Sequence, residues 1–142
     1  AVLFIDLDNF KTVNDSFGHA CGDEVIAVVG RRLQGCARAG DTPARLGGDE
    51  FALLLVGMGA EQVMALADRV LAALGETPVE FGGRTKTIGA SIGIAIAESG
   101  ETTETILRNA DLAMYQAKLR GRYRPALSEP GMHAPGVNRF KP

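Results

Sequence analysis

Residues 42–56 read TPARLGGDEFALLLV, and this stretch decides the fold. Two strand-like segments, 42–46 and 51–56, flank the glycine pair Gly47 and Gly48. Because glycine accepts the positive backbone angles of a tight turn, the pattern predicts a β-hairpin turned on this pair. The two strands of a hairpin are antiparallel, so the sheet around it is expected to be antiparallel as well.

The hydropathy pattern outside the hairpin predicts further strands and helices. The apolar run 1–5 and the segment 88–97 are typical of buried strands, and 81–84 is typical of a tight turn. The polar stretch 9–18 predicts one or two helical turns. Apolar residues recur every three or four positions in three segments, which predicts helices over about 22–37, 63–74 and 106–121. This order predicts an α+β fold, a central antiparallel sheet flanked by helices.

Composition excludes several classes of protein. The chain has 142 residues, 46% of them hydrophobic, and carries 15 Lys+Arg against 17 Asp+Glu. With a mean hydropathy of +0.06, these values describe one globular domain. The apolar runs are far shorter than the roughly 20 residues that span a bilayer. The near-neutral charge argues against duplex nucleic acid. We therefore expect neither membrane contact nor a nucleic-acid partner from this segment.

The two cysteines are expected to be free thiols. A helix joining Cys21 to Cys36 would be roughly 22 Å long, whereas a disulfide requires Cα atoms within about 7 Å. Free thiols suit a reducing compartment, so we expect a cytoplasmic location, within a larger protein.

The residues near the two ends of the sequence predict the domain boundaries. It opens directly on the apolar run of the first strand, so we expect a further segment upstream. Prolines break any regular pattern near the other end, at Pro125, Pro130, Pro135 and Pro142. The sequence thus predicts a domain over 1–124 and a proline-rich tail or linker over 125–142.

Acidic residues stand at two predicted strand ends, Asp6-Leu7-Asp8 and Asp49-Glu50. Alternation along a strand places Asp6 and Asp8 on one face. Carboxylates are the ligands that Mg²⁺ prefers, and two convergent acids on adjacent strands suit metal-assisted phosphoryl transfer. Alone, however, an isolated D-x-D is more often a solvated strand end, and a Gly-Gly-Asp-Glu turn more often only a hairpin.

Five motifs, taken together in order, make the sequence more specific. They are DLDNFKTVND at 6–15, FGHACGD at 17–23, GGDEF at 47–51, SIGIA at 91–95 and DLAMYQAK at 111–118. This series resembles the GGDEF family of diguanylate cyclases over residues 1 to about 122. The resemblance implies a palm-like (ferredoxin-like or nucleotide-cyclase-like) sheet. It also implies condensation of two GTP molecules into cyclic di-GMP with release of pyrophosphate, each GTP being held by one subunit of a homodimer.

The resemblance also implies roles for the acidic residues. Asp6, the Leu7 carbonyl and Asp49 would hold Mg²⁺ (or Mn²⁺). Asp49 is the best candidate to assist deprotonation of the attacking 3′-hydroxyl, and Glu50 would bind metal or orient its neighbours.

Nucleotide-binding positions follow from the same motifs. Asn14 and Asp23 match the positions that bind guanine; judged without the motifs, they would be a loop cap and an acid at a helix N-terminus. The expected phosphate ligands are the backbone amides of Asn9 and Phe10 and the side chains of Lys11, Lys118 and Arg122. Without the motifs, the last two would be cations that complement a helix dipole.

The R-x-x-D motif Arg38–Asp41 stands at the spacing of the family's product-inhibition site, where cyclic di-GMP would bind, and Arg69 matches a further arginine of that site. A bare R-x-x-D is more often only structural. Two other interpretations remain: a non-catalytic module that binds GTP or cyclic di-GMP and regulates a partner domain, and a purely structural palm domain. Because family domains usually begin further upstream and catalysis needs two loaded subunits, we expect this fragment alone to be weakly active or inactive.

Overall fold

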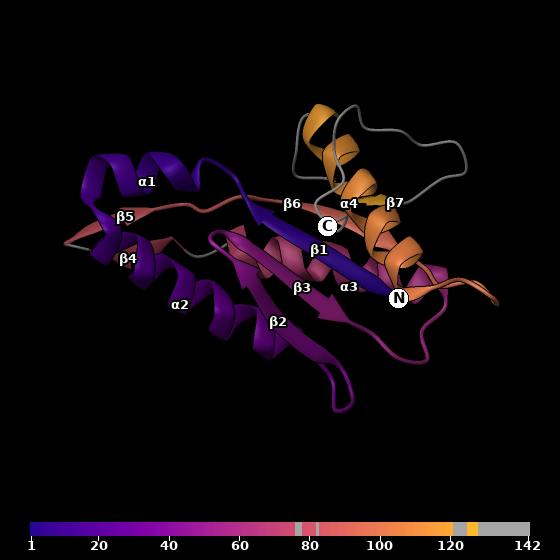
Figure 1. The fold of residues 1–142 in the computed structure, drawn as a ribbon. Helices are drawn as coiled ribbons and strands as arrows, with labels where there is room; N and C mark the ends of the chain where they lie inside the picture. Colours follow the sequence, from indigo (N-terminus) through magenta and orange to yellow (C-terminus); the bar gives the residue numbers. More distant parts are fainter. Residues whose placement is uncertain (76–77, 82, 121–124, 128–142) are drawn as a thin grey trace.

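The computed structural model describes residues 1–75, 78–81, 83–120 and 125–127 (Figure 1). The elements in chain order are β1 (Val2–Leu7), α1 (Phe10–Phe17), α2 (His19–Cys36), β2 (Thr42–Gly47), β3 (Glu50–Leu54), α3 (Ala60–Gly75), β4 (Val79–Phe81), β5 (Arg84–Lys86), β6 (Ala90–Ala95), α4 (Thr103–Leu119) and β7 (Ala126–Leu127). No helix in these ranges is long and apolar enough to cross a membrane.

The main sheet has the strand order β2-β3-β1-β6-β7, and β4 pairs with β5 in a separate two-stranded sheet. Pairing is antiparallel from β2 through β6, which confirms the predicted α+β fold. The last pair, β6 with β7, is parallel, so the sheet is mixed. The expectation of irregular structure after residue 124 is therefore wrong at Ala126 and Leu127. This dipeptide contains no proline, and it pairs with Gly93 and Ile94.

The hairpin forms where the glycine pair predicts it. Gly47 and Gly48 have φ of 142° and 52°, and a β-bulge lies between Arg45 and Gly47. The helix predicted from Gly22 begins earlier, at His19, because Gly18, with φ of 88°, separates α1 from α2 without a longer loop. Helix α4 ends at Leu119; Gly121, the predicted helix stop, lies outside the described residues.

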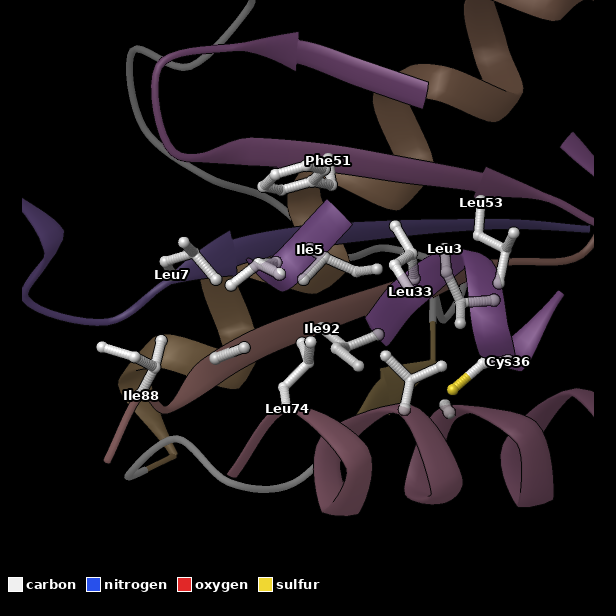
Figure 2. Packing of buried hydrophobic residues seen from close by; sticks show 14 of the residues in the cluster. Leu3, Ile5, Leu7, Leu33, Cys36, Phe51, Leu53, Leu74, Ile88 and Ile92 are labelled. Atoms are coloured by element: carbon white, nitrogen blue, oxygen red, sulfur yellow. The ribbon is translucent and has the colours of Figure 1, made fainter. Parts of the chain in front are cut away.

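Helices cover both faces of the sheet (Figure 1). On one face, apolar side chains of the strands pack against α2 and α3. Figure 2 shows this layer, with Leu3, Ile5, Phe51, Leu53 and Ile92 pointing toward Leu33, Cys36 and Leu74. On the other face a smaller cluster forms where α4 packs on the strands: Ala110 and Met114 of α4 against Val2, Phe4 and Ala95 of the sheet. Cys21 and Cys36 are free, as predicted.

Helix α4 lies directly on the backbone of β6 at Gly93. A Cβ placed on this glycine would stand 2.1 Å from the Met114 nitrogen and 2.3 Å from the Ala110 oxygen, both backbone atoms. Only a residue without a side chain permits this approach. Lys118 follows Met114 by about one helical turn, so the same contact sets where Lys118 lies relative to the sheet.

Gly93→Ala should therefore destabilise the domain. The added methyl meets backbone on α4 that cannot rotate away, so we expect the free energy of unfolding to fall by about 3 kcal/mol. Urea unfolding followed by circular dichroism measures this. Gly35→Ala is the matched control. Gly35 is an exposed residue of α2 and a Cβ there would meet nothing within 4 Å, so this substitution should stabilise the domain by about 0.5–1 kcal/mol. Equal unfolding free energies for wild type and Gly93→Ala would contradict this close approach.

Candidate active site

An acidic cluster lies where β1, β3 and β6 meet at one end of the sheet. In the register of the strands, Asp6 stands opposite Glu50 on one side and opposite Ser91 on the other. These side chains share the sheet face that α4 covers, because Val2 and Phe4, at alternate positions of β1, pack beneath that helix. Lys118 of α4 completes the cluster by an ion pair with Asp6.

Asp6 and Asp49, predicted as metal ligands, converge in this cluster. Asp6 is buried; its Oδ2 accepts a hydrogen bond from Lys118 Nζ, and its Oδ1 is buried without a hydrogen-bond donor among the described residues. The pKa of Asp49 is raised to about 6, chiefly by burial and further by the neighbouring carboxyl of Asp6 and the charge of Glu50. Two carboxyl groups this close favour either a shared proton or a cation between them.

Backbone hydrogen bonds fix the two acid-bearing segments against each other. The Leu7 N–H donates to the Asp49 carbonyl at 3.1 Å, which ties the hairpin bend to the end of β1. The next residue, Asp8, donates its N–H to the Gly89 carbonyl at 2.9 Å. The predicted metal contact of the Leu7 carbonyl stays a prediction.

The structure places two further residues in this region that were not predicted from the sequence. Ser91, fully buried, donates its hydroxyl to Asp8 Oδ1 at 2.9 Å. Arg45 donates from Nε and Nη2 to the Gly48 carbonyl, at 3.2 and 2.8 Å, and so braces the bend that carries Asp49. Ser91 could have been predicted from the sequence, because it carries the single hydroxyl group in the apolar strand Ala90–Ala95. Nothing in the sequence pattern singles out Arg45.

The donor set suits a small, hard cation. The described residues include no group of three or more His, Cys, Asp or Glu side chains arranged as a ready metal cage. Mg²⁺ does not require one, since it commonly binds one or two carboxylates and completes its shell with water and substrate phosphates. The unpartnered Oδ1 of buried Asp6 and the neighbouring Asp49 carboxyl match that requirement, and Mn²⁺ accepts the same oxygen ligands.

The predicted phosphate ligands gather at the beginning of α1, directly after Asp8. Asn9 precedes the helix in a left-handed conformation, with φ of 58°; Phe10 is the first helical residue, and Lys11 is exposed beside it. Backbone amides of a first helical turn and the positive end of the helix dipole favour an anion there. Lys118 lies at the same end of the sheet, at Asp6. Arg122 lies outside the described residues.

Asn14 and Asp23, the predicted guanine ligands, come from α1 and α2, two helices in contact with each other. Asn14 lies inside α1, and its Oδ1 is buried without a partner among the described residues, so it caps no loop. Asp23 is exposed in the second turn of α2, because the helix begins at His19. The alternative role as an acid in the first turn therefore does not apply.

The R-x-x-D residues lie at the opposite end of β2 from Gly47. Arg38 donates from Nε to Asp41 Oδ2 and from Nη2 to Asp41 Oδ1, both at 3.1 Å, and from Nη2 to the Val56 carbonyl at 2.8 Å. This hydrogen bonding lowers the pKa of Asp41 and raises that of Arg38. Burial raises the pKa of the Cys36 thiol, and the charge of Arg69 opposes the rise. Arg69 of α3 thus lies near Cys36, the last residue of α2. Arg38 follows Cys36 by two positions in the chain.

The raised pKa of Asp49 predicts how stability depends on pH. Its carboxyl titrates near 3.8 when unperturbed and at about 6 in the folded chain. Between these values the folded state holds more protons than the unfolded state, so this group's contribution to stability falls as pH rises and is fully lost above about 6. Asp49→Asn, which carries no charge, should therefore gain melting temperature relative to wild type from about pH 4 to about pH 7.

Scanning calorimetry in EDTA at both pH values tests this expectation. Asp68→Asn, at an exposed position of α3, is the control and should show no such pH-dependent difference. A difference between Asp49→Asn and wild type that stays constant with pH would contradict the proximity of Asp49 to Asp6.

Comparisons with known proteins agree with this geometry. The family model described as "Diguanylate cyclase, GGDEF domain" matches residues 1–124. The bifunctional diguanylate cyclase/cyclic di-GMP phosphodiesterase MucR of Pseudomonas aeruginosa is 42% identical over 135 residues, covering 94% of this chain and 20% of MucR. The chain spans between 15% and 35% of the length of MucR and two other curated relatives.

Solved structures share the fold. The crystal structure of the GGDEF domain of TpbB (YfiN) from Pseudomonas aeruginosa has a TM-score of 0.85 and 41% identity, covering 90% of this chain and 81% of that one. The GGDEF domain of DgcB from Caulobacter crescentus, solved in complex with cyclic di-GMP, also has a TM-score of 0.85, with 28% identity and coverage of 89% and 76%. The palm-like fold and the resemblance are thereby confirmed. This chain belongs to the family of diguanylate cyclase GGDEF domains.

Proposed function

We propose that the chain is the catalytic domain of a diguanylate cyclase, which condenses two GTP molecules into cyclic di-GMP and pyrophosphate. One observation carries the proposal: the carboxyl groups of Asp6 and Asp49, from two separate motifs, converge at a strand end beside a helix N-terminus and Lys118. A site for a divalent cation next to a site for phosphates is what phosphoryl transfer requires.

The reaction joins the 3′-oxygen of each GTP to the α-phosphorus of the other, so two such bonds form and two pyrophosphates leave. A bond from this oxygen to phosphorus forms, the bond from the α-phosphorus to the bridging oxygen breaks, and pyrophosphate leaves with that oxygen. The chemistry that Mg²⁺ or Mn²⁺ supplies when bound at Asp6 and Asp49 is neutralisation of the phosphate charge. The 3′-hydroxyl proton passes to Asp49, whose carboxylate is held beside Asp6 at the hairpin bend.

The remaining residues bind and orient the substrate. The amides of Asn9 and Phe10 and the ammonium groups of Lys11 and Lys118 hold the phosphates, since they stand at or beside the acidic cluster. Arg122 is proposed for the same task. Asn14 and Asp23 bind the guanine base, and Glu50, opposite Asp6, binds metal or orients its neighbours.

Each chain supplies one such site, so two chains must face each other as a homodimer to join two GTP molecules. Cyclic di-GMP is proposed to inhibit from the R-x-x-D site, where Arg38, Asp41 and Arg69 offer charged groups at the far end of β2. A guanidinium fork suits both phosphate and guanine.

A second function remains in view because one relative is named as bifunctional. A domain of this family within such a protein could bind GTP or cyclic di-GMP and regulate a partner phosphodiesterase domain. The intact acids Asp49 and Glu50 favour the cyclase. Turnover distinguishes the two functions, since only the cyclase forms product.

Asp49→Ala should reduce cyclic di-GMP formation from GTP and Mg²⁺ about a hundredfold or more, because it removes both a metal ligand and the proposed base. Chromatography of the nucleotides measures product. Asp68→Ala, at an exposed position of α3, is the control and should retain wild-type activity. Near wild-type turnover by Asp49→Ala would sink the cyclase assignment. Because this fragment alone is expected to be weakly active or inactive, the assay uses the full-length dimeric protein, in which tight GTP binding without turnover by the wild type would support the regulatory module.

Arg38→Ala should weaken binding of cyclic di-GMP about tenfold or more, because a charge-assisted hydrogen-bond donor is lost. Calorimetric titration of the product gives the affinity directly. Arg31→Ala, at an exposed position in the C-terminal half of α2, serves as the matched control. Unchanged product affinity in Arg38→Ala would count against the inhibitory site.

A further inference from the structure

Gly22 lies where α2 packs against α1, directly before Asp23, and it is buried. A Cβ placed on this glycine would stand 1.9 Å from Asn14 Oδ1, 3.0 Å from Asn14 Cγ and 3.2 Å from Phe10 Cζ. The end of the Asn14 side chain therefore occupies the space that any other residue at position 22 would fill.

The backbone gives no other reason for a glycine here. Gly22 lies inside α2, and its φ is not among the positive values found at other glycines of the chain. Inside a helix, glycine is less favourable than alanine by about 0.5–1 kcal/mol. Gly35, on the same helix, has open space around its Cβ position, so contact with a neighbour distinguishes Gly22.

Asn14 is a polar group that lacks a partner. Its Oδ1 is buried and accepts no hydrogen bond from any described residue. A buried carbonyl oxygen without a partner is unfavourable, and a ligand that supplies the missing hydrogen bond gains affinity. Guanine carries N–H donors at N1 and N2, whereas adenine presents an acceptor at N1 and has no amino group at C2.

We propose that Gly22 is a positioning residue for base selection. Because it has no side chain, it leaves room for the Asn14 amide in the orientation that favours guanine over adenine. The inference rests on the proposed function, in which Asn14 binds the base. Gly22 touches no reacting atom, and its effect passes through Asn14.

The contact differs in kind from that at Gly93. At Gly93 the obstructing atoms belong to the backbone of α4; at Gly22 they are the end of a rotatable side chain and the edge of a ring. A methyl group at position 22 therefore turns Asn14 to another rotamer, while α1 and α2 keep their places. Selectivity for the base is lost, but the phosphate and metal contacts near Asp6 remain.

Calorimetric titration of the chain with GTP and with ATP, both in Mg²⁺, tests the inference. In Gly22→Ala we expect GTP affinity to fall about tenfold, as for loss of one hydrogen bond, with ATP affinity unchanged. Asn14→Ala should show the same loss. The double variant should lose no more than either single variant, because alanine at position 14 leaves room for the methyl group. Gly35→Ala is the control and should keep the wild-type ratio of affinities.

Several outcomes would overturn the inference: an unchanged GTP-to-ATP ratio in Gly22→Ala, additive losses in the double variant, or equal losses for both nucleotides. If Gly22→Ala lowers the melting temperature, adding Asn14→Ala should restore it, and failure to do so would place the clash elsewhere. No preference for GTP in the wild type would contradict the proposed function itself, whereas a wild-type preference that survives Gly22→Ala contradicts only this inference.

Discussion

The register of the central strand β1 is the constraint on which the site depends. β1 pairs with β3 and β6, so the neighbours of Asp6 are fixed as Glu50 and Ser91. A slip of one residue would turn Asp6 into the apolar layer beneath α2 and α3, and would turn Ile5 toward α4. Burying a charged carboxylate among apolar side chains is far more unfavourable than the observed pairing with Lys118. The core layer in Figure 2 therefore enforces the geometry of the acidic cluster from the opposite face.

The acidic cluster at Asp6 and Asp49 lowers the stability of the folded chain at neutral pH. Asp49 has its pKa raised by burial and by Asp6, so at neutral pH the folded chain carries two negative charges side by side. Rigid surroundings resist their separation: the Leu7 N–H and Arg45 hold the bend, and Ser91 holds Asp8. Groups held in place in this way need little reorganisation when charge develops during a reaction.

Local patterns predict most of the fold and much of the site. The glycine pair predicts the hairpin, apolar spacing predicts the helices, and acids at strand ends predict the cluster. What could not be predicted depends on contacts between distant segments. The parallel pairing of β7 and the Ser91–Asp8 and Lys118–Asp6 bonds join residues 33, 83 and 112 positions apart. The role inferred for Gly22 likewise requires knowing which atom of α1 stands against it, because the sequence shows only a glycine within a helical pattern.

The ion pair of Lys118 with Asp6 has a consequence for the charge that a cation meets at the acidic cluster. Buried Asp6 receives its positive partner from α4 of the same chain, so its charge is compensated within the polypeptide. The charge of Asp49, which Asp6 and Glu50 repel, is the one that a bound divalent cation would still have to offset. One of the two convergent carboxylates is thus paired by the chain's own lysine, and the other is left for an incoming cation.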